Sequence, residues 1–171
     1  MKIAIQGLGE VPTTIEIVLK KEKPDITYIV TSDYQLNLVA PHAGYKLSNR
    51  EVIEKTARKV KTEVKFKKCD PFDPESVSKT IREILEEIDP EKDEVIVNYT
   101  GGSSLVRLLL GATGVVLPTV MKAKVLYAIK YPEGTEIMAD HTRMLREIFP
   151  EDLQVLFSLK KGKKFSSKPK S

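Results

Sequence analysis

The sequence contains one cysteine, Cys69, and no tryptophan. A single cysteine excludes an internal disulfide bond and any metal site that needs several thiolates. Cys69 stands at the end of a strand-like segment, so we expect an inert thiol in the core. No run of His, Cys and Asp residues has the spacing of a metal site. We therefore expect neither a metal ion nor a cofactor.

Long hydrophobic runs are also missing. The longest apolar stretch, residues 105–117, is interrupted by Arg107 and closed by Pro118, and it is too short to span a bilayer. The chain opens on MKIAIQ, which lacks the basic, apolar and small residues of a secretory signal. We therefore expect a cytoplasmic protein with no membrane partner.

The excess positive charge is concentrated near the C-terminus. The chain has a formal net charge of +4, but residues 158–171 hold six lysines and no acidic residue. Without these lysines, 22 basic residues face 24 acidic ones, so the rest of the chain has no basic surplus. We expect a single domain over residues 1–157 and a Lys-rich flexible tail over 158–171. Such a tail allows weak contact with nucleic-acid phosphates.

Short segments rich in Val, Ile and Tyr alternate with helical patterns along the chain. Ser48 and Glu51 form a capping box, and Asp73 precedes Pro74 at a first helical position, so both places predict helix starts. The alternation predicts an α/β fold, a Rossmann-like, doubly wound, mostly parallel sheet of five to six strands with helices on both faces. We expect the strand order 3-2-1-4-5, with strands at 2–6, 26–31, 63–68, 94–99 and 124–130.

The C-terminal third is less regular. YPEGTE (131–136) predicts a turn, and the segment 141–149 has a helical pattern. The apolar run 153–159 fits a last strand or an arm on a partner subunit.

Two loops carry the chemistry of this sequence. In open parallel sheets, ligands bind where the winding reverses, which here lies between the first and fourth strands. The loops after these strands, GLGEVPTT (7–14) and TGGSS (100–104), are both rich in glycine and hydroxyl groups. Gly101 and Gly102 can adopt positive φ and admit a ligand to the backbone. The first loop and TGGSS together therefore favour a phosphate site.

Ser103 and Ser104 stand at the expected helix start, where free amides and the helix dipole attract an anion. Arg107 lies one turn further on and either reaches the same anion or braces the loop. An ordinary capped helix, whose serines only satisfy the backbone, is the alternative.

A dinucleotide site is a second alternative. GLGEVP resembles half of the G-x-G-x-x-G fingerprint, with Asp33 where an acid for the ribose would stand. The third glycine is replaced by Pro12, which has no amide hydrogen for a pyrophosphate, and Glu10 brings a negative charge into the turn.

The segment NYTGGSS, with a Gly/Thr loop after the first strand, resembles the CARF (CRISPR-associated Rossmann fold) domain over residues 1 to about 130. Thr100, Gly101, Gly102 and Ser103 carry the resemblance. It implies binding of cyclic oligoadenylate, the second messenger of type III CRISPR immunity, by a twofold homodimer with the ring across its axis. Many family members carry Thr then Lys after the two glycines, where this chain has Ser103 and Ser104. Arg107 then replaces the missing charge, or backbone amides hold the ligand.

The resemblance and the loop positions together give a set of expected site residues. Tyr34 is placed to stack on an adenine, and the loop 40–45, which contains His42, is placed to act as a lid. The ligand-binding residues that we expect are Gly7, Leu8, Gly9, Thr13, Ser32, Asp33, Tyr34, Thr100, Gly101, Gly102, Ser103 and Ser104.

Some stand-alone relatives in the resembled family are ring nucleases, which cleave the ring without a metal to a 2′,3′-cyclic phosphate. The chain ends too soon for an effector domain, which favours a degrader of cyclic tetra-adenylate over a sensor. The catalytic residues that we expect are Ser103, Ser104 and Arg107. Two alternatives stay open: a module that only binds the messenger and acts through a partner, and an unrelated Rossmann-like enzyme acting on a nucleotide.

Overall fold

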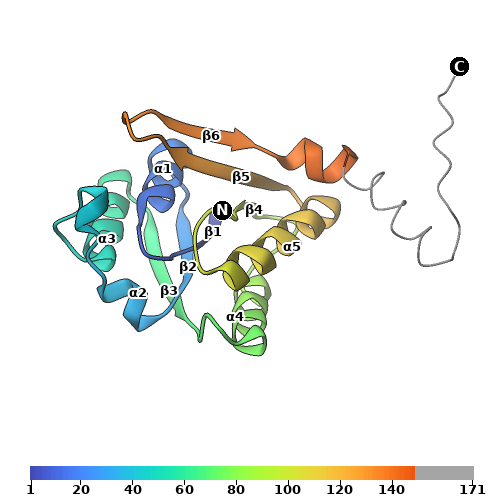
Figure 1. Cartoon of the computed structure of the whole chain (residues 1–171). Coiled ribbons are helices and arrows are strands. Elements are labelled where there is room, and N and C mark those ends of the chain that lie inside the picture. Colours follow the sequence, from blue (N-terminus) through green and yellow to red (C-terminus); the bar gives the residue numbers. More distant parts are fainter. Residues whose placement is uncertain (149–171) are drawn as a thin grey trace, which may run out of the picture.

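A computed structural model describes residues 1–148 of the chain. Its strands form one six-stranded sheet in the order β3-β2-β1-β4-β5-β6 (Figure 1). The first five strands pair in parallel, and β6 pairs antiparallel with β5. The predicted α/β class and the order 3-2-1-4-5 are therefore confirmed. The strands are β1 (Lys2–Gly7), β2 (Ile26–Thr31), β3 (Glu63–Lys68), β4 (Glu94–Asn98), β5 (Ala123–Lys130) and β6 (Glu136–Asp140).

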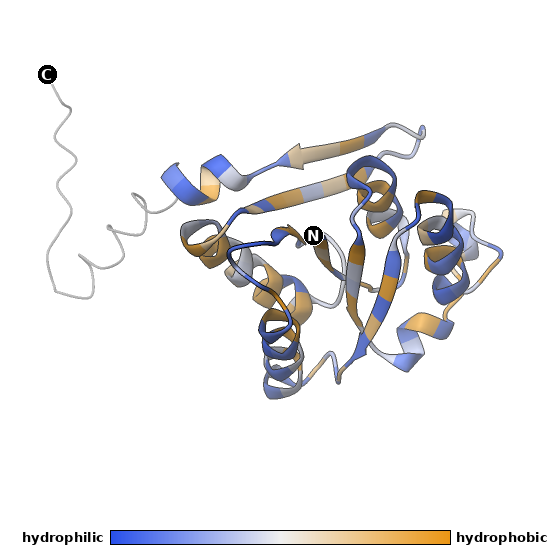
Figure 2. Cartoon of the chain, turned by 180° about the vertical axis from the view of Figure 1, so that it is seen from behind, coloured by the Kyte–Doolittle hydropathy of each residue, from blue (hydrophilic) through white to orange (hydrophobic). Residues whose placement is uncertain are grey.

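Helices cover both faces of the sheet (Figure 1). On one face, α1 (Thr13–Glu22) and α3 (Asn49–Val60) bury Ile15, Leu19 and Ile53 against β2. On the other face, α4 (Pro74–Glu86) and α5 (Ser104–Val120) pack their apolar sides against β1, β2 and β4. Figure 2 shows apolar residues concentrated on the strands, while polar and apolar residues alternate along the helices. Since α1 follows β1 on one face and α5 follows β4 on the other, the winding reverses between β1 and β4.

Both predicted helix starts are confirmed. Ser48 and Glu51 form the capping box of α3, and the Asp73 side chain caps α4 with Pro74 at its first position. A second capping box, which the sequence analysis did not anticipate, joins Ser32 and Gln35. It opens the short helix α2 (Asp33–Asn37), so the residues after β2 form a helix rather than an open loop.

The structure corrects the expectation for the C-terminal third. The turn ends earlier than predicted, at Gly134 with φ +102°, and Glu136–Asp140 continue as β6. This strand lies at the edge of the sheet and has five residues. It is held by its pairing with β5 and not by an apolar pattern of its own. A short π-helix follows at Met144–Ile148. The run 153–159 and the Lys-rich tail 158–171 lie outside the described residues.

Two further observations on residues 1–148 concern membrane crossing and metal binding. Over residues 1–148, no helix combines the length and apolar character that a membrane crossing needs. The same part of the chain contains no group of three or more His, Cys, Asp or Glu side chains placed to hold a metal ion.

Candidate functional site at the carboxyl edge of the sheet

Gly7 and Gly101 let the loops after β1 and β4 approach each other closely. A Cβ atom on Gly7 would lie 2.4 Å from the Gly101 carbonyl oxygen, and one on Gly101 would lie 2.5 Å from the Gly7 carbonyl oxygen. No side chain fits at either position without moving the backbone. These two predicted ligand residues are therefore glycines because of packing, and they fix the spacing of the two loops.

Gly102 has a different reason to be glycine. Its φ of +107° lies in the region that side chains disfavour, and an added Cβ would come within 2.8 Å of the Val106 Cγ1 atom. This backbone turn directs the chain from the sheet edge into α5. Gly9, opposite, has more room, since its added Cβ would come no closer than 3.4 Å to Gly102.

Ser103 is the N-cap of α5. Its hydroxyl accepts a hydrogen bond from the Val106 amide (3.3 Å) and donates one to the Pro71 carbonyl (3.0 Å). Ser104 is the first helical residue, and its side chain is exposed. Among residues 1–148, the amides of Ser104 and Leu105 find no acceptor. The start of α5 therefore presents free amide donors and one free hydroxyl.

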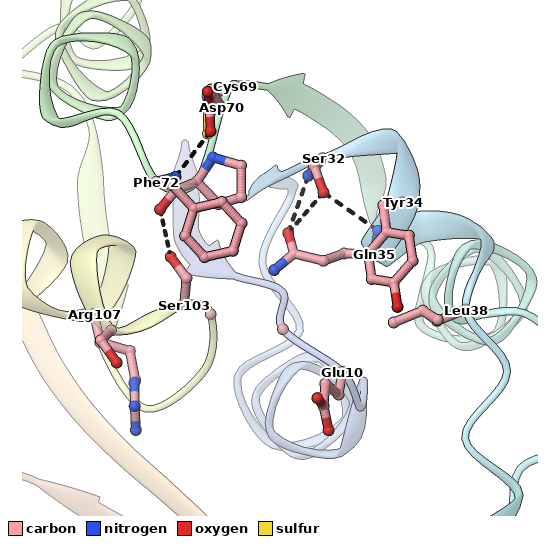
Figure 3. Close-up of a pocket in the computed structure, with 14 residues that line it drawn as sticks. Glu10, Ser32, Tyr34, Gln35, Leu38, Cys69, Asp70, Phe72, Ser103 and Arg107 are labelled. Carbon is pink, nitrogen blue, oxygen red and sulfur yellow. Dashed lines mark hydrogen bonds between the residues drawn. The ribbon is translucent and has the colours of Figure 1, made fainter.

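A pocket of about 650 Å³ opens beside this helix start (Figure 3). It lies between the β1–α1 loop, α2, the β3–α4 loop and the start of α5. The pocket therefore sits at the carboxyl edge of the sheet, where the fold predicts a ligand. Its lining residues are Gly9, Glu10, Ser32, Tyr34, Gln35, Leu38, Cys69, Asp70, Pro71, Phe72, Gly102, Ser103, Ser104 and Arg107.

Two aromatic side chains project into solvent at this pocket. Tyr34 is 74% exposed and Phe72 is 86% exposed, although both are large and partly apolar. The Phe72 amide donates to the Asp70 carboxylate (2.9 Å), which fixes the turn that carries the ring. Exposed aromatic rings on a fixed backbone provide surfaces on which a nucleobase can stack.

The charged groups of the pocket are unevenly placed. Arg107 is exposed at the α5 side, and its guanidinium forms no ion pair with another residue of the described chain. Glu10 and Asp70 also line the pocket and are exposed. Figure 3 shows Arg107 and Asp70 at opposite sides of Ser103. An anion is therefore favoured at the α5 end, where the guanidinium and the free amides lie.

Cys69 lies in the pocket wall and not in the deep core that the sequence predicted. Burial of the side chain raises the pKa of its thiol above the ordinary value, and the nearby Asp70 carboxylate raises it further by a smaller amount. The thiol therefore stays protonated near neutral pH, which agrees with the expected low reactivity.

Several predicted ligand residues lie elsewhere. Leu8 is fully buried, and the Thr13 hydroxyl forms a hydrogen bond with the Tyr45 hydroxyl (2.9 Å). Asp33 is exposed and forms an ion pair with Lys68 at 2.7 Å. Tyr45 ends the expected lid 40–45, and its hydroxyl donates to the Glu16 carboxylate (2.6 Å), which ties that segment to α1. None of these residues lines the pocket.

Thr100 lines a smaller neighbouring cavity of about 370 Å³. Its hydroxyl accepts a hydrogen bond from the Ala128 amide (2.8 Å), so it ties the end of β4 to β5. This cavity shares Ser104 and Arg107 with the first pocket and is otherwise lined by Tyr99, Thr100, Leu108 and Tyr127. Ser104 and Arg107 thus stand between two hollows and are accessible from both.

The structure therefore brings together seven of the predicted site residues, namely Gly9, Ser32, Tyr34, Gly102, Ser103, Ser104 and Arg107. It adds Gln35, Phe72 and Cys69, which the sequence analysis did not assign to a ligand. One signal for Phe72 was present: an aromatic residue in the polar turn DPFDP directly after the third strand. Gln35 became visible only through α2, which was not predicted.

Comparisons with known proteins support the fold. No protein-family model matches this chain, and no curated protein matches its sequence. Among solved structures, Csm6 from Enterococcus italicus, bound to cyclic hexa-2′-fluoro-hexa-dAMP, is similar with a TM-score of 0.57 and 15% identity, over 78% of this chain and 34% of that one. Can2 from Sulfobacillus thermosulfidooxidans, in complex with cyclic tetra-adenylate, is similar with a TM-score of 0.53 and 18% identity, over 79% and 36% of the chains.

A type III CRISPR defence DNA nuclease activated by cyclic oligoadenylate is similar with a TM-score of 0.52 and 14% identity, over 78% of this chain and 20% of that one. These likenesses establish that the chain has the fold of a CARF domain, as its NYTGGSS segment predicted. The chain spans about a third of the length of the first two proteins and about a fifth of the third.

Proposed function

We propose that this chain binds a cyclic oligoadenylate, cyclic tetra-adenylate foremost, in the pocket between α2, the β3–α4 loop and α5. The observation that carries the proposal is one pocket that combines two exposed aromatic rings with a guanidinium at a helix start. Tyr34 and Phe72 supply stacking surfaces for adenine, while Arg107 and the free amides of α5 attract a phosphate. Two of the similar structures hold a cyclic oligoadenylate or its analogue, which supports this choice of ligand.

We propose that two copies of the chain share one ring. Along α5, the exposed residues Leu108, Ala112, Val116 and Val120 recur every fourth position and form an apolar stripe on one side of the helix. Leu108 is 67% exposed and Val120 is 68% exposed. Ser104 begins the same stripe, so a second copy whose α5 docks parallel to the first brings its own site beside the first. A cyclic tetranucleotide has a twofold symmetry that such a dimer matches.

We propose further that the bound ring is cleaved slowly and without a metal. The ribose 2′-oxygen attacks the adjacent phosphorus, the bond from phosphorus to the 5′-oxygen breaks, and a 2′,3′-cyclic phosphate forms. The proton of the 2′-hydroxyl passes to solvent, and solvent protonates the leaving 5′-oxygen. This reaction depends on in-line positioning and on stabilising the charge of the transition state. Arg107 and the Ser104 hydroxyl are free for these tasks, whereas the Ser103 hydroxyl is engaged in capping.

A module that only binds the messenger is the second candidate. The observation that favours it is Ser104, which stands where many members of the resembled family carry a lysine. A dinucleotide site finds little support, because Asp33 is paired with Lys68 and Glu10 lies in the pocket wall.

Incubating the pure protein with radiolabelled cyclic tetra-adenylate in EDTA separates these functions. We expect the ring to be bound and converted to linear products that carry a 2′,3′-cyclic phosphate. A ring that stays bound and intact supports the binding module. A ring that neither binds nor reacts contradicts the proposed function.

Protection of Cys69 from a thiol reagent is a second, independent test of where the ligand binds. Because Cys69 lines the pocket, saturating cyclic tetra-adenylate is expected to slow its reaction with a thiol reagent, measured at alkaline pH where the thiolate is present. Cyclic tetra-adenylate that binds without slowing this reaction places the ligand outside the pocket.

A further inference from the structure

Gln35 presents one free donor group, the Nε2 amide with its two N–H bonds, to the pocket. Its side-chain oxygen accepts from the Ser32 amide (3.1 Å), the Ser32 hydroxyl (3.2 Å) and the Thr31 hydroxyl (3.3 Å). The Ser32 amide is a donor only, so it fixes which end of the Gln35 side chain carries the oxygen. The remaining Nε2 group makes no hydrogen bond within residues 1–148. Figure 3 shows this nitrogen turned away from Ser32 and toward the side of the pocket where Phe72 and Ser103 lie.

The main chain of Gln35 is held as firmly as its side chain. The Gln35 amide donates to the Ser32 hydroxyl (3.3 Å), and its carbonyl accepts from the Asn49 side chain (2.9 Å). Asn49 is fully buried and also donates to the Glu10 carbonyl (2.9 Å), which joins α2 to the β1–α1 loop. The Gln35 donor is therefore fixed before any ligand arrives, so little entropy is lost when it forms a hydrogen bond.

We propose that Gln35 reads the nucleobase that stacks at Tyr34 and Phe72, by donating from Nε2 to a ring nitrogen. Adenine offers unprotonated nitrogens at N1, N3 and N7 as acceptors, whereas a carboxylate at this position faces them with repelling lone pairs. The inference rests on the proposed function and adds to it a residue that contacts the base. A hydrogen bond to N1 also selects adenine over guanine, whose N1 carries a hydrogen, whereas N3 and N7 are acceptors in both bases.

The variant Gln35→Glu tests this directly, because it changes the donor and preserves the cap. A glutamate at the third helical position can still accept from the Ser32 amide and from the Ser32 and Thr31 hydroxyls, as Glu51 accepts from the Ser48 amide and hydroxyl in α3. We expect its affinity for cyclic tetra-adenylate to fall by roughly tenfold or more, because a donor is replaced by an acceptor. The thermal unfolding midpoint is expected to stay close to that of the wild type.

Glu51→Gln is the matched control. It makes the reverse exchange in the capping box of α3, Ser48–Glu51, whose residues do not line the pocket. This variant is expected to bind cyclic tetra-adenylate with the wild-type dissociation constant.

Deaza analogues test the hydrogen bond without changing the protein. Cyclic tetra-adenylates with 1-deaza, 3-deaza or 7-deaza bases each lack one acceptor nitrogen. We expect one of the three to bind the wild type roughly tenfold more weakly and to bind Gln35→Glu no worse than the parent ring does.

These experiments distinguish failure of the role of Gln35 from failure of the proposed function. If the wild type binds cyclic tetra-adenylate while Gln35→Glu binds it equally well, the role of Gln35 is wrong and the proposed function stands. If all three deaza analogues bind the wild type as tightly as the parent ring does, the role of Gln35 is also wrong and the proposed function stands. If the wild type binds no cyclic tetra-adenylate, the proposed function fails and this inference fails with it.

Discussion

At the residue scale, Arg107 is the cation on which the account depends. The guanidinium lines both hollows at the start of α5 and has no ion-pair partner among the described residues. Charge develops on the phosphate in the transition state, so a nearby cation contributes more to the rate than to binding. We expect Arg107→Ala to reduce the single-turnover cleavage rate by about 10²–10³-fold and to weaken binding less.

Arg82→Ala is the matched control for that loss of charge, because Arg82 is exposed on α4 and away from the pocket lining. It should behave as the wild type in both measurements. An Arg107→Ala protein with wild-type rate and affinity means that this arginine is structural.

The structure separates the two serines of TGGSS, to which the sequence analysis gave the same expected role: Ser103 caps α5 and Ser104 is the first helical residue. Ser103 is the residue that caps α5, so Ser103→Ala is expected to lower the free energy of unfolding by about 1 kcal/mol. Ser104→Ala removes an exposed hydroxyl at the first helical position and should leave stability near the wild-type value. Urea unfolding of both variants measures the difference. Equal loss of stability in both contradicts this assignment.

The sequence predicted the site only partly, and the reason is physical. TGGSS and Arg107 were recognisable because glycine, serine and a nearby cation at a strand-to-helix turn suit anion binding. Gly7 and Gly101 carry the same signal but do not line the pocket, and close packing of the two loops accounts for glycine at both positions. Phe72 and Gln35 were not anticipated in the pocket lining, because their placement depends on exposure and on hydrogen bonds that only the folded chain defines.

At the element scale, the turn from β4 into α5 depends on Gly102. A valine there would combine a disfavoured positive φ with a Cβ only 2.8 Å from Val106 Cγ1. We therefore expect Gly102→Val to lower stability by roughly 1–3 kcal/mol as well as to abolish binding.

Gly9→Ala is the gentler probe of the same pocket, since the added Cβ meets Gly102 at 3.4 Å and φ is not in the positive region. It should keep wild-type stability and place a methyl group beside the ligand. Differential scanning calorimetry compares the two variants, and a Gly102→Val protein as stable as Gly9→Ala would contradict the strain at this turn.

Glu87 links the end of α4 to the sheet. Its carboxylate accepts from the Tyr28 hydroxyl (2.7 Å) and pairs with Lys67. These hydrogen bonds lower the pKa of Glu87 from 4.5 to about 2, and the bond from Lys67 contributes most. Because the folded pKa lies below the unfolded one, the stabilisation is present above about pH 4.5 and is lost as the pH falls toward 2.

We therefore expect Glu87→Gln to destabilise the protein near neutral pH by about 0–1 kcal/mol, a small value because the carboxylate is partly exposed. The difference in the free energy of unfolding between Glu87→Gln and the wild type should vanish near pH 2. Urea unfolding at neutral pH and near pH 2 measures this difference. A difference that does not change with pH would show that the charge of Glu87 contributes nothing.

Most elements were predictable, and the exceptions share a cause. Four of the five parallel strands are apolar enough to identify from the sequence, and β3 shows Val64 and Phe66 alternating with charged residues. The starts of α3 and α4 carry recognisable caps. The missed elements are short: α2 and β6 have five residues each. Segments of this length depend on neighbours, here the Ser32–Gln35 capping box and the pairing with β5.

At the scale of the whole molecule, the account requires two copies around one ligand. The stripe at 108, 112, 116 and 120 runs along α5 from the site, so the same helix supplies the anion site and the proposed dimer contact. A dimer held this way places two pockets beside one ring, and each copy then contacts half of the nucleotides.

The most direct test of the central claim is a calorimetric titration of the purified chain with cyclic tetra-adenylate at several protein concentrations, on a timescale short compared with cleavage. The account predicts saturable binding with one ring per two chains, and loss of that binding in a Tyr34→Ala, Phe72→Ala double variant that retains its fold. One ring per chain would contradict the shared site. Heats no larger than those of dilution would contradict the proposed ligand itself.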